Sequence, residues 1–120
     1  NPEGVKAFRD ELEAESRAEE LGEKVEEAIA GPVEKKDLAA AEAAIEKVLK
    51  DSGAKGELRV SILAQYRIGV IARCKPGDFA ALLKATDEII AEAGDSPLLP
   101  RLKAMRERIE QAAGRKTEGK

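Results

Sequence analysis

Residues 58–74 read LRVSILAQYRIGVIARC, and every even-numbered position in this stretch is apolar. Such alternation is typical of a β-strand, but seventeen residues exceed the usual strand length and no other segment offers a partner strand. A β-hairpin turning at Ala64-Gln65 is the remaining β alternative, although these residues lack the positive-φ preference of a tight turn. On a helix, the polar or small positions share one face because they are four residues apart: Ser61, Gln65, Gly69 and Arg73. The rest is apolar nearly all round, which predicts a central helix contacted on several sides.

A short phrase recurs on either side of this central segment. It is Lys36-Asp37-Leu38-Ala39-Ala40 before the segment and Gly77-Asp78-Phe79-Ala80-Ala81 after it. The two aspartates lie 78 − 37 = 41 residues apart, a spacing in the range of stacked helical hairpins. Both phrases open an apolar helical run and so mark the start of a helix, and Asp78 is a good N-cap for the second of these runs.

The chain is therefore predicted to be all-α, with about five helices in antiparallel hairpins packed around the central helix at 58–74. The first segment, 2–30, forms either one helix or two helices separated near Gly22, and Gly31-Pro32 is expected to end it. The other helices are expected at about 33–51, from Asp78 to Gly94, and from Ser96-Pro97 onward. Gly69 is expected to let a neighbouring helix approach closely.

The length and composition predict one domain over residues 1–114, with a polar tail or linker at 115–120. The chain has one cysteine and no histidine, so an intramolecular disulfide and a zinc site of Cys and His are excluded, and we expect no metal and no cofactor. Aromatic residues make up 2% and the net charge is −3, which speaks against nucleic-acid binding. No apolar run is long enough to span a membrane.

The compartment is left open by the sequence. The lack of disulfides fits the cytoplasm, whereas the start at Asn1-Pro2 without a methionine suggests processing or an excised piece. A periplasmic location after removal of a signal peptide therefore stays an alternative.

The third and fourth predicted helices resemble a tetratricopeptide repeat, a helical hairpin of about 34 residues. The resemblance rests on Gly77-Asp78-Phe79 followed by the small residue Ala85, with a fainter copy in Lys36-Asp37-Leu38, and it covers residues 35–113. Helix 58–74 aligns with the repeat only after a one-residue slip around Gly69. The resemblance implies a protein-interaction scaffold, and similar helical segments in bacterial envelope proteins often precede thioredoxin-like or other catalytic domains.

The candidate partner-binding residues lie in the central segment. An arginine can grip a carboxylate with two hydrogen bonds, so these residues could line a groove that captures an acidic peptide or a chain terminus: Gln65, Tyr66, Arg67 and Arg73. Alternatively, the two arginines pair with acidic residues of neighbouring helices or extend to the surface. Cys74 has no histidine or second cysteine to act with, and is expected to be a small buried residue.

The charges are unevenly distributed along the chain. Residues 1–34 hold 11 acidic and 4 basic residues, and residues 95–120 hold 4 acidic and 7 basic ones. The acidic run from Glu11 to Glu27 is a solvated surface, a docking face for a basic partner, or a weak cation-binding surface. It could also dock within the chain against the basic last helix, which carries Arg101, Lys103, Arg106 and Arg108.

These observations predict a non-catalytic domain that binds protein or peptide, as an adaptor or as an accessory part of a larger polypeptide or assembly. The alternative is a helical homodimer formed through the first helix, around Phe8. An enzyme is the third hypothesis, and it is disfavoured because neighbouring carboxylates such as Asp87 and Glu88 diverge by about 100° on a helix.

Overall fold

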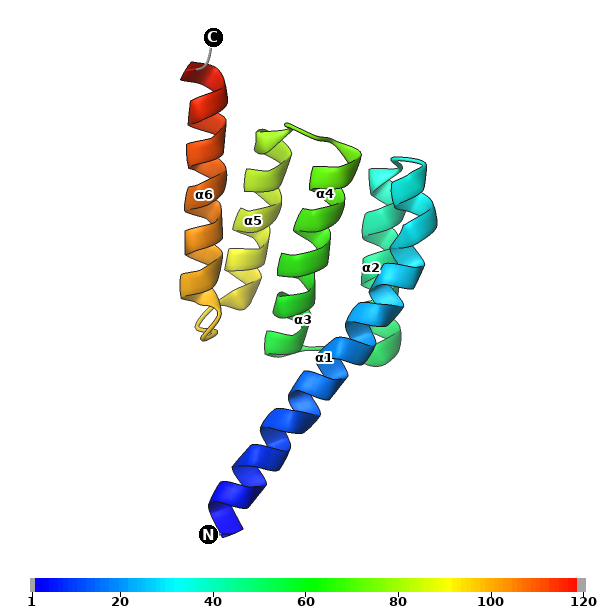
Figure 1. Ribbon diagram of the computed structural model, residues 1–120, viewed down its shortest axis with the longest axis vertical. Coiled ribbons are helices and arrows are strands. Elements are labelled where there is room, and N and C mark those ends of the chain that lie inside the picture. Colours follow the sequence, from blue (N-terminus) through cyan, green and yellow to red (C-terminus); the bar gives the residue numbers. More distant parts are fainter. Residues whose placement is uncertain (1, 119–120) are drawn as a thin grey trace.

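The computed structural model describes residues 2–118, and the side chains of residues 16–114. These residues form helices and no strand, which confirms the all-α prediction (Figure 1). The elements are α1 (Pro2–Glu34), α2 (Leu38–Ser52), α3 (Gly56–Ile62), the π-helical turn η1 (Leu63–Arg67), α4 (Ile68–Cys74), α5 (Phe79–Ala93) and α6 (Leu99–Glu118). The first half of α1 extends beyond the other helices (Figure 1). α6 continues through 115–118, so part of the expected polar tail is helical.

α3, η1 and α4 follow one another without a break and form a single central rod from Gly56 to Cys74. The rod contacts α1, α2 and α5, as the apolar character of 58–74 predicted. The helices form antiparallel pairs, with α1 against α2, α4 against α5, and α5 against α6. As a result α1, the rod and α6 run in the same direction, and α2 and α5 run in the opposite one (Figure 1).

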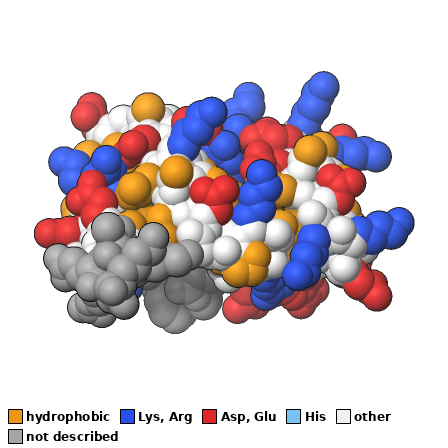
Figure 2. All heavy atoms as spheres, turned by 90° about the horizontal axis from the view of Figure 1, so that it is seen from above, with side chains coloured by type: hydrophobic (Ala, Val, Ile, Leu, Met, Phe, Trp, Pro, Cys, Tyr) orange, Lys and Arg blue, Asp and Glu red, His pale blue; other side chains and the backbone are white. Residues whose placement is uncertain are grey.

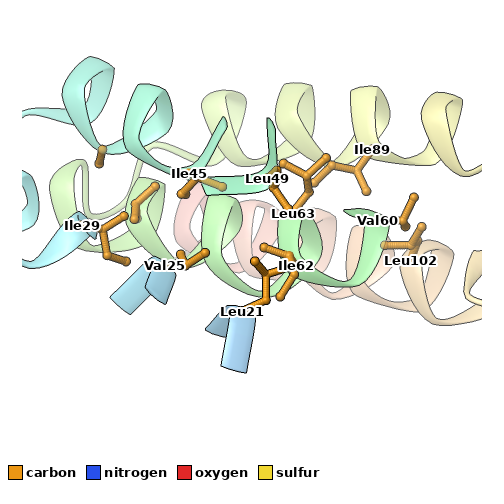
Figure 3. Close-up of a cluster of buried hydrophobic side chains, with 12 residues drawn as sticks. Leu21, Val25, Ile29, Ile45, Leu49, Val60, Ile62, Leu63, Ile89 and Leu102 are labelled. Carbon is orange, nitrogen blue, oxygen red and sulfur yellow. The ribbon is translucent and has the colours of Figure 1, made fainter. Parts of the chain in front are cut away.

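The main hydrophobic core lies where these helices meet (Figure 3). Val25 from α1, Ile45 and Leu49 from α2, and Ile89 from α5 are at most 1% exposed. Thr86 is the one buried polar side chain among residues 16–114, and its hydroxyl donates a hydrogen bond to the carbonyl of Leu82 at 2.7 Å. Since this internal bond satisfies the hydroxyl, Thr86 can lie in an apolar environment without an unpaired polar group.

The π-turn η1 changes which positions of the rod share a face. Positions eight apart on an ideal α-helix differ in direction by about 80°, so they do not share a face. A π-turn takes in roughly one additional residue and reduces this difference to about 20°. Accordingly, the adjacent pairs Ile62-Leu63 and Val70-Ile71, eight residues apart, are all buried. The one-residue slip that the repeat alignment needed around Gly69 lies directly after this turn.

The N-cap predicted at Asp78 is confirmed, and Asp37 caps α2 in the same way. The Asp37 carboxylate accepts a hydrogen bond from the Ala40 amide, and the Asp78 carboxylate accepts one from the Ala81 amide, both at 3.1 Å. These bonds satisfy amides that have no partner within the helix, so each aspartate fixes where its helix begins. α5 also ends as predicted, at Ala93 before Gly94.

The predicted end of the first helix and the predicted start of the second were wrong. α1 is continuous through Gly22 and ends at Glu34 rather than before Gly31-Pro32. Val33, which we expected to open the second helix, belongs to α1 and packs against the core. The turn to α2 is instead made at Lys36, whose φ of 56° lies in the left-handed region. The packing of the partly buried Val33 against the core thus favours a helix that continues past Pro32, a residue that normally stops one.

α6 begins later than the sequence predicted. The Ser96 hydroxyl accepts a hydrogen bond from the Leu98 amide at 3.1 Å, as a cap would, but this bond closes a turn in front of the helix. The helix itself begins at Leu99, two residues after the expected Pro97. A second turn bond, from the Leu99 amide to the Ser96 carbonyl, accounts for the delay.

Candidate functional site

A groove of about 560 Å³ lies between α1 and the central rod. Its floor is mainly apolar, and Glu26 and Glu34 stand on the α1 side while Gln65 and Arg73 stand on the rod side. We call it the α1–α4 groove, and its lining residues are Glu26, Ile29, Ala30, Val33, Glu34, Gln65, Tyr66, Gly69, Val70 and Arg73. An apolar floor with a few polar groups at the edge is the usual composition of a binding site.

Three of the four predicted site residues meet in this groove. Gln65 and Arg73 are exposed and Tyr66 is partly buried. Gln65 and Arg73 belong to the polar stripe recognised in the sequence, and η1 keeps the two residues on the same face although they are eight positions apart. Within residues 16–114 Arg73 forms no ion pair, so its guanidinium remains available in the groove.

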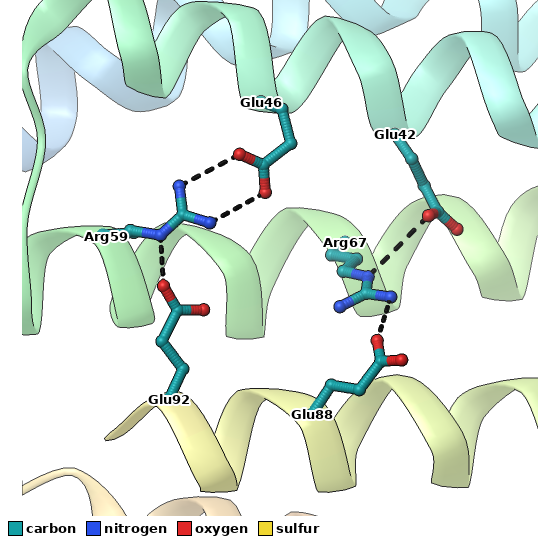
Figure 4. Close-up of polar contacts among 6 residues, drawn as sticks. All are labelled: Glu42, Glu46, Arg59, Arg67, Glu88 and Glu92. Atoms are coloured by element: carbon teal, nitrogen blue, oxygen red, sulfur yellow. Dashed lines mark hydrogen bonds and ion pairs between the residues drawn. The ribbon is translucent and has the colours of Figure 1, made fainter. Parts of the chain in front are cut away.

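The fourth predicted residue, Arg67, points to another part of the molecule (Figure 4). Its guanidinium contacts the Glu88 carboxylate of α5 at 2.5 Å and the Glu42 carboxylate of α2 at 3.9 Å. For Arg67 the structure therefore shows the alternative that the sequence left open, an ion pair with neighbouring helices. Arg67 does not line the α1–α4 groove.

Arg59 makes a matching contact two turns earlier on the rod. It donates two hydrogen bonds to the Glu46 carboxylate of α2, at 2.9 and 3.1 Å, and another to Glu92 of α5 (Figure 4). The hydrogen bonds to Glu46 and then to Glu92 raise the pKa of Arg59 above its ordinary value. Arg59 and Arg67 together connect the rod to both flanking helices, so their role is structural.

A neighbouring helix approaches closely at Gly22, whereas the sequence predicted this close approach at Gly69. A Cβ atom added at Gly22 would lie 2.5 Å from the Tyr66 hydroxyl, whereas one added at Gly69 would meet nothing within 4 Å. Gly22 is buried between α1 and the rod, and its missing side chain makes room for the tyrosine. Gly69 leaves open space in the groove, and this openness is its contribution to the site.

Tyr66 connects the core to the groove. Its ring packs against the main hydrophobic cluster, and its hydroxyl lies beside Gly22 in the wall of the groove. Burial raises the pKa of the Tyr66 phenol, and the nearby Glu26 carboxylate raises it further. The neutral phenol is thus favoured, and it can donate a hydrogen bond at the groove over a wide pH range.

A second, smaller groove of about 210 Å³ lies on the other side of the rod. We call it the α3–α6 groove, and its lining residues are Ser61, Ala64, Gln65, Leu98, Arg101, Leu102 and Met105. Gln65 lines both grooves, so the two form one continuous surface across α1, the rod and α6. We call this surface, made of the lining residues of the two grooves, the grooved face.

The contribution of α6 to this surface was not predicted, because Arg101 and Arg108 were considered only as part of a basic last helix. In the structure Arg101, Leu102 and Met105 of α6 line the α3–α6 groove, and Arg108 lies on the same side of the helix as Arg101. The sequence feature that could have revealed this contribution is the spacing of seven residues between the two arginines, which places both on one side of the helix. Both side chains are exposed.

The neighbouring carboxylates of α5 pair with different helices, and residues 16–114 hold no metal-binding group. Asp87 pairs with Arg106 of α6 at 2.5 Å, whereas Glu88 pairs with Arg67 of the rod, so the two carboxylates diverge as expected. Residues 16–114 contain no group of three or more acidic or cysteine side chains that could hold a metal ion. Cys74 is buried, in agreement with its predicted role as a small core residue.

The end of the molecule that carries the α1–α2 and α4–α5 turns is covered by charges of both signs (Figure 2). Lysine and arginine side chains project from it between acidic ones, with hydrophobic side chains in the spaces (Figure 2).

The comparisons with known proteins give no relative. No protein-family model matches the chain, and no match is found among the curated proteins or the solved structures. In the described part of the chain, no helix combines the length and the apolar character needed to cross a membrane.

Proposed function

We propose that this chain is a non-catalytic protein-interaction domain, an adaptor or an accessory part of a larger polypeptide or assembly, and that it binds through the grooved face. The observation that carries the proposal is the α1–α4 groove, which collects Gln65, Tyr66 and Arg73 around an apolar floor. The π-turn η1 contributes Gln65 and Tyr66 to this groove, and such turns are frequent at functional sites. The resemblance to tetratricopeptide repeats points in the same direction.

The ion pairs of the other arginines on and around the rod support this assignment. Arg59, Arg67 and Arg106 all hold carboxylates of neighbouring helices, so they contribute to packing. Arg73 and Arg101 have no such partner within residues 16–114, and both line the grooved face. Unpaired arginines beside apolar surface are characteristic of protein-binding surfaces.

Blocking the groove tests the proposal. A Gly69→Trp substitution places a large side chain into open space in the α1–α4 groove, so the fold is retained while the groove is filled. Gly31→Trp on α1 is the matched control, because it also enters open space but lies outside the groove.

Crosslinked pull-down from an extract of the source cells compares these two variants with the unchanged chain. We expect the unchanged chain and Gly31→Trp to capture the same proteins, and Gly69→Trp to lose them while its circular dichroism spectrum stays helical. Equal capture by a folded Gly69→Trp would refute binding through this groove.

A further inference from the structure

The charges of α1 are sorted by sign around the helix. Four exposed glutamates, which we call the acidic rim, fall within about 80° of one another around the helix axis: Glu19, Glu23, Glu26 and Glu34. Glu26 and Glu34 line the α1–α4 groove, so the other two lie along the same edge. The two basic residues of 16–34, Arg17 and Lys24, line a separate hollow against the α2–α3 turn. None of the rim glutamates forms an ion pair within residues 16–114.

The groove beside the acidic rim has room for apolar side chains. Ala30, Val33 and Tyr66 keep part of their surface exposed there. Gly69 leaves the rod side open, since an added Cβ atom would meet nothing within 4 Å. The volume of about 560 Å³ lies within the range of sites that enclose a ligand. An occupant can therefore bury apolar side chains between α1 and the rod.

The backbone of the occupant decides which form it takes. Within the described residues all elements are helical, so there is no strand edge with which an extended peptide could pair. An extended backbone pressed against Ala30 and Val33 would leave N–H and C=O groups without partners, at a cost in free energy for each group. A helix satisfies these groups within itself. The groove therefore favours a helix with an apolar stripe.

The acidic rim sets the charge of that helix. Four glutamates without ion pairs attract lysines and arginines and repel carboxylates. The acidic peptide that the sequence suggested would place its carboxylates beside these glutamates. On the rod side, Arg73 is exposed and forms no ion pair within residues 16–114, so it can hold a single acidic residue. The groove as a whole thus favours a basic occupant.

The helices of this chain do not meet these requirements. α6 is basic, but its apolar residues Leu102 and Ile109 pack into the hydrophobic clusters of the same chain. α2 and α5 bury their apolar faces as well. Residues 1–15 hold five acidic and two basic residues, so they have the wrong charge. Phe8, around which the sequence suggested a dimer, lies outside the residues whose side chains are described. The occupant is therefore sought in another protein.

We propose that the α1–α4 groove binds a basic amphipathic helix of another protein, which buries its apolar stripe between α1 and the rod and directs lysines or arginines toward the acidic rim. The inference rests on the proposed function, for which it names the class of partner. The rim extends from Glu19 to Glu34, about 22 Å along α1, so a helix of about 16 residues spans it. Its charges are exposed, so salt screens them and weakens binding.

A displayed peptide library provides the test, with the full chain as the bait. Each peptide has about 16 residues and a fixed leucine stripe, and the positions beside the stripe vary among lysine, glutamate and glutamine. We expect lysine to be enriched on one side of the stripe. Enrichment of glutamate, or no preference among the three residues, would overturn the proposal.

Fluorescence anisotropy then measures how tightly the enriched lysine peptide binds to variants of the chain. The variant Glu19→Gln/Glu23→Gln/Glu26→Gln removes three charges of the acidic rim. The loss of three exposed ion pairs predicts binding about tenfold weaker in low salt, and a smaller difference in ~0.5 M salt. Circular dichroism shows whether the variant keeps its helices.

The matched control, Glu20→Gln/Asp51→Asn/Glu107→Gln, removes three exposed charges that do not line the groove. Its affinity for the peptide should stay within about twofold of that of the unchanged chain, because distant exposed charges are screened. Equal affinities of the rim variant and this control would refute the role of the acidic rim.

Two further measurements test the groove and the helical form of the occupant. Gly69→Trp should abolish binding of the lysine peptide, whereas Gly31→Trp should preserve it. A proline in the middle of the peptide breaks its helix and should also abolish binding. Undiminished binding of the proline peptide would indicate an extended occupant and overturn the proposal.

The outcomes separate the class of partner from the proposed function. If Gly69→Trp abolishes binding of an enriched peptide that is not basic, the groove still binds protein and only the class of partner is wrong. If no peptide is enriched, or if the enriched peptide binds Gly69→Trp and the unchanged chain equally, the inference fails. Capture from the cell extract by Gly69→Trp and Gly31→Trp then decides the proposed function independently.

Discussion

The contact between Gly22 and Tyr66 makes a quantitative prediction about stability. In a helix interior, replacing glycine by alanine stabilises by about 1 kcal/mol. At Gly22, however, the new Cβ would lie 2.5 Å from the Tyr66 hydroxyl, about 1 Å closer than an ordinary contact of ~3.5 Å. The tyrosine must turn outward, which uncovers on the order of 80 Å² of apolar surface and costs about 2 kcal/mol. We therefore expect Gly22→Ala to lower the free energy of unfolding by about 1 kcal/mol.

Two further variants isolate the cause. Gly31→Ala lies in the same helix but meets open space, so it should raise the free energy of unfolding by up to about 1 kcal/mol. In a Tyr66→Phe background the clashing oxygen is gone, and the nearest ring carbon is 3.4 Å away, so Gly22→Ala should become stabilising. Urea unfolding followed by circular dichroism measures all of these changes. Equal stabilisation by Gly22→Ala and Gly31→Ala in the unchanged background would refute the close approach.

The remaining predictions concern the groove tyrosine, the arginines and the core. Tyr66 is the only tyrosine, so ultraviolet titration of the chain should give a midpoint above the ordinary pKa of ~10, and Glu26→Gln should lower it. Since folding raises the pKa of Tyr66, the neutral phenol contributes fully to stability below pH ~10, and this contribution is lost as the pH rises through the pKa of the folded protein. A titration midpoint at or below ~10 would contradict the raised pKa. Arg59→Met/Arg67→Met should lower the free energy of unfolding by about 1–2 kcal/mol in low salt and by less in ~1 M salt, and a salt-independent loss would exclude the ion pairs as its cause. Ile45→Ala should cost about 2–5 kcal/mol in chemical denaturation, whereas Ala43→Ser on the exposed side of the same helix should cost under about 0.5.

Local chemistry allowed much of the fold to be predicted from the sequence. Asp37 and Asp78 cap helices because their carboxylates accept backbone hydrogen bonds within three residues, a relation that needs no tertiary structure. The end of α1 could not be predicted in this way. There the packing of the partly buried Val33 against the core, a tertiary effect, favours a helix that continues past the stop signal of Gly31-Pro32.

The candidate site was predicted only in part, for a geometric reason. The stripe that contains Gln65 and Arg73 is visible in the sequence as a repeat of four residues, but the π-turn η1 that keeps both residues on one face is not. The fate of Arg67 depends on Glu42 and Glu88, which are distant in sequence and become neighbours only when α2 and α5 pack on the rod. The role of Gly22 likewise depends on where a single hydroxyl of another helix comes to lie.

The π-turn has a consequence for how this chain can change in length. A helix that already accommodates one additional residue can lose it without breaking, so a deletion within 63–67 would leave a regular α-helix. The second half of the rod would keep its orientation relative to the first, because the π-turn already absorbs the rotation of one residue, and Arg73 would stay on the side of the groove. A regular helix one residue shorter would therefore present the same binding surface as the present rod.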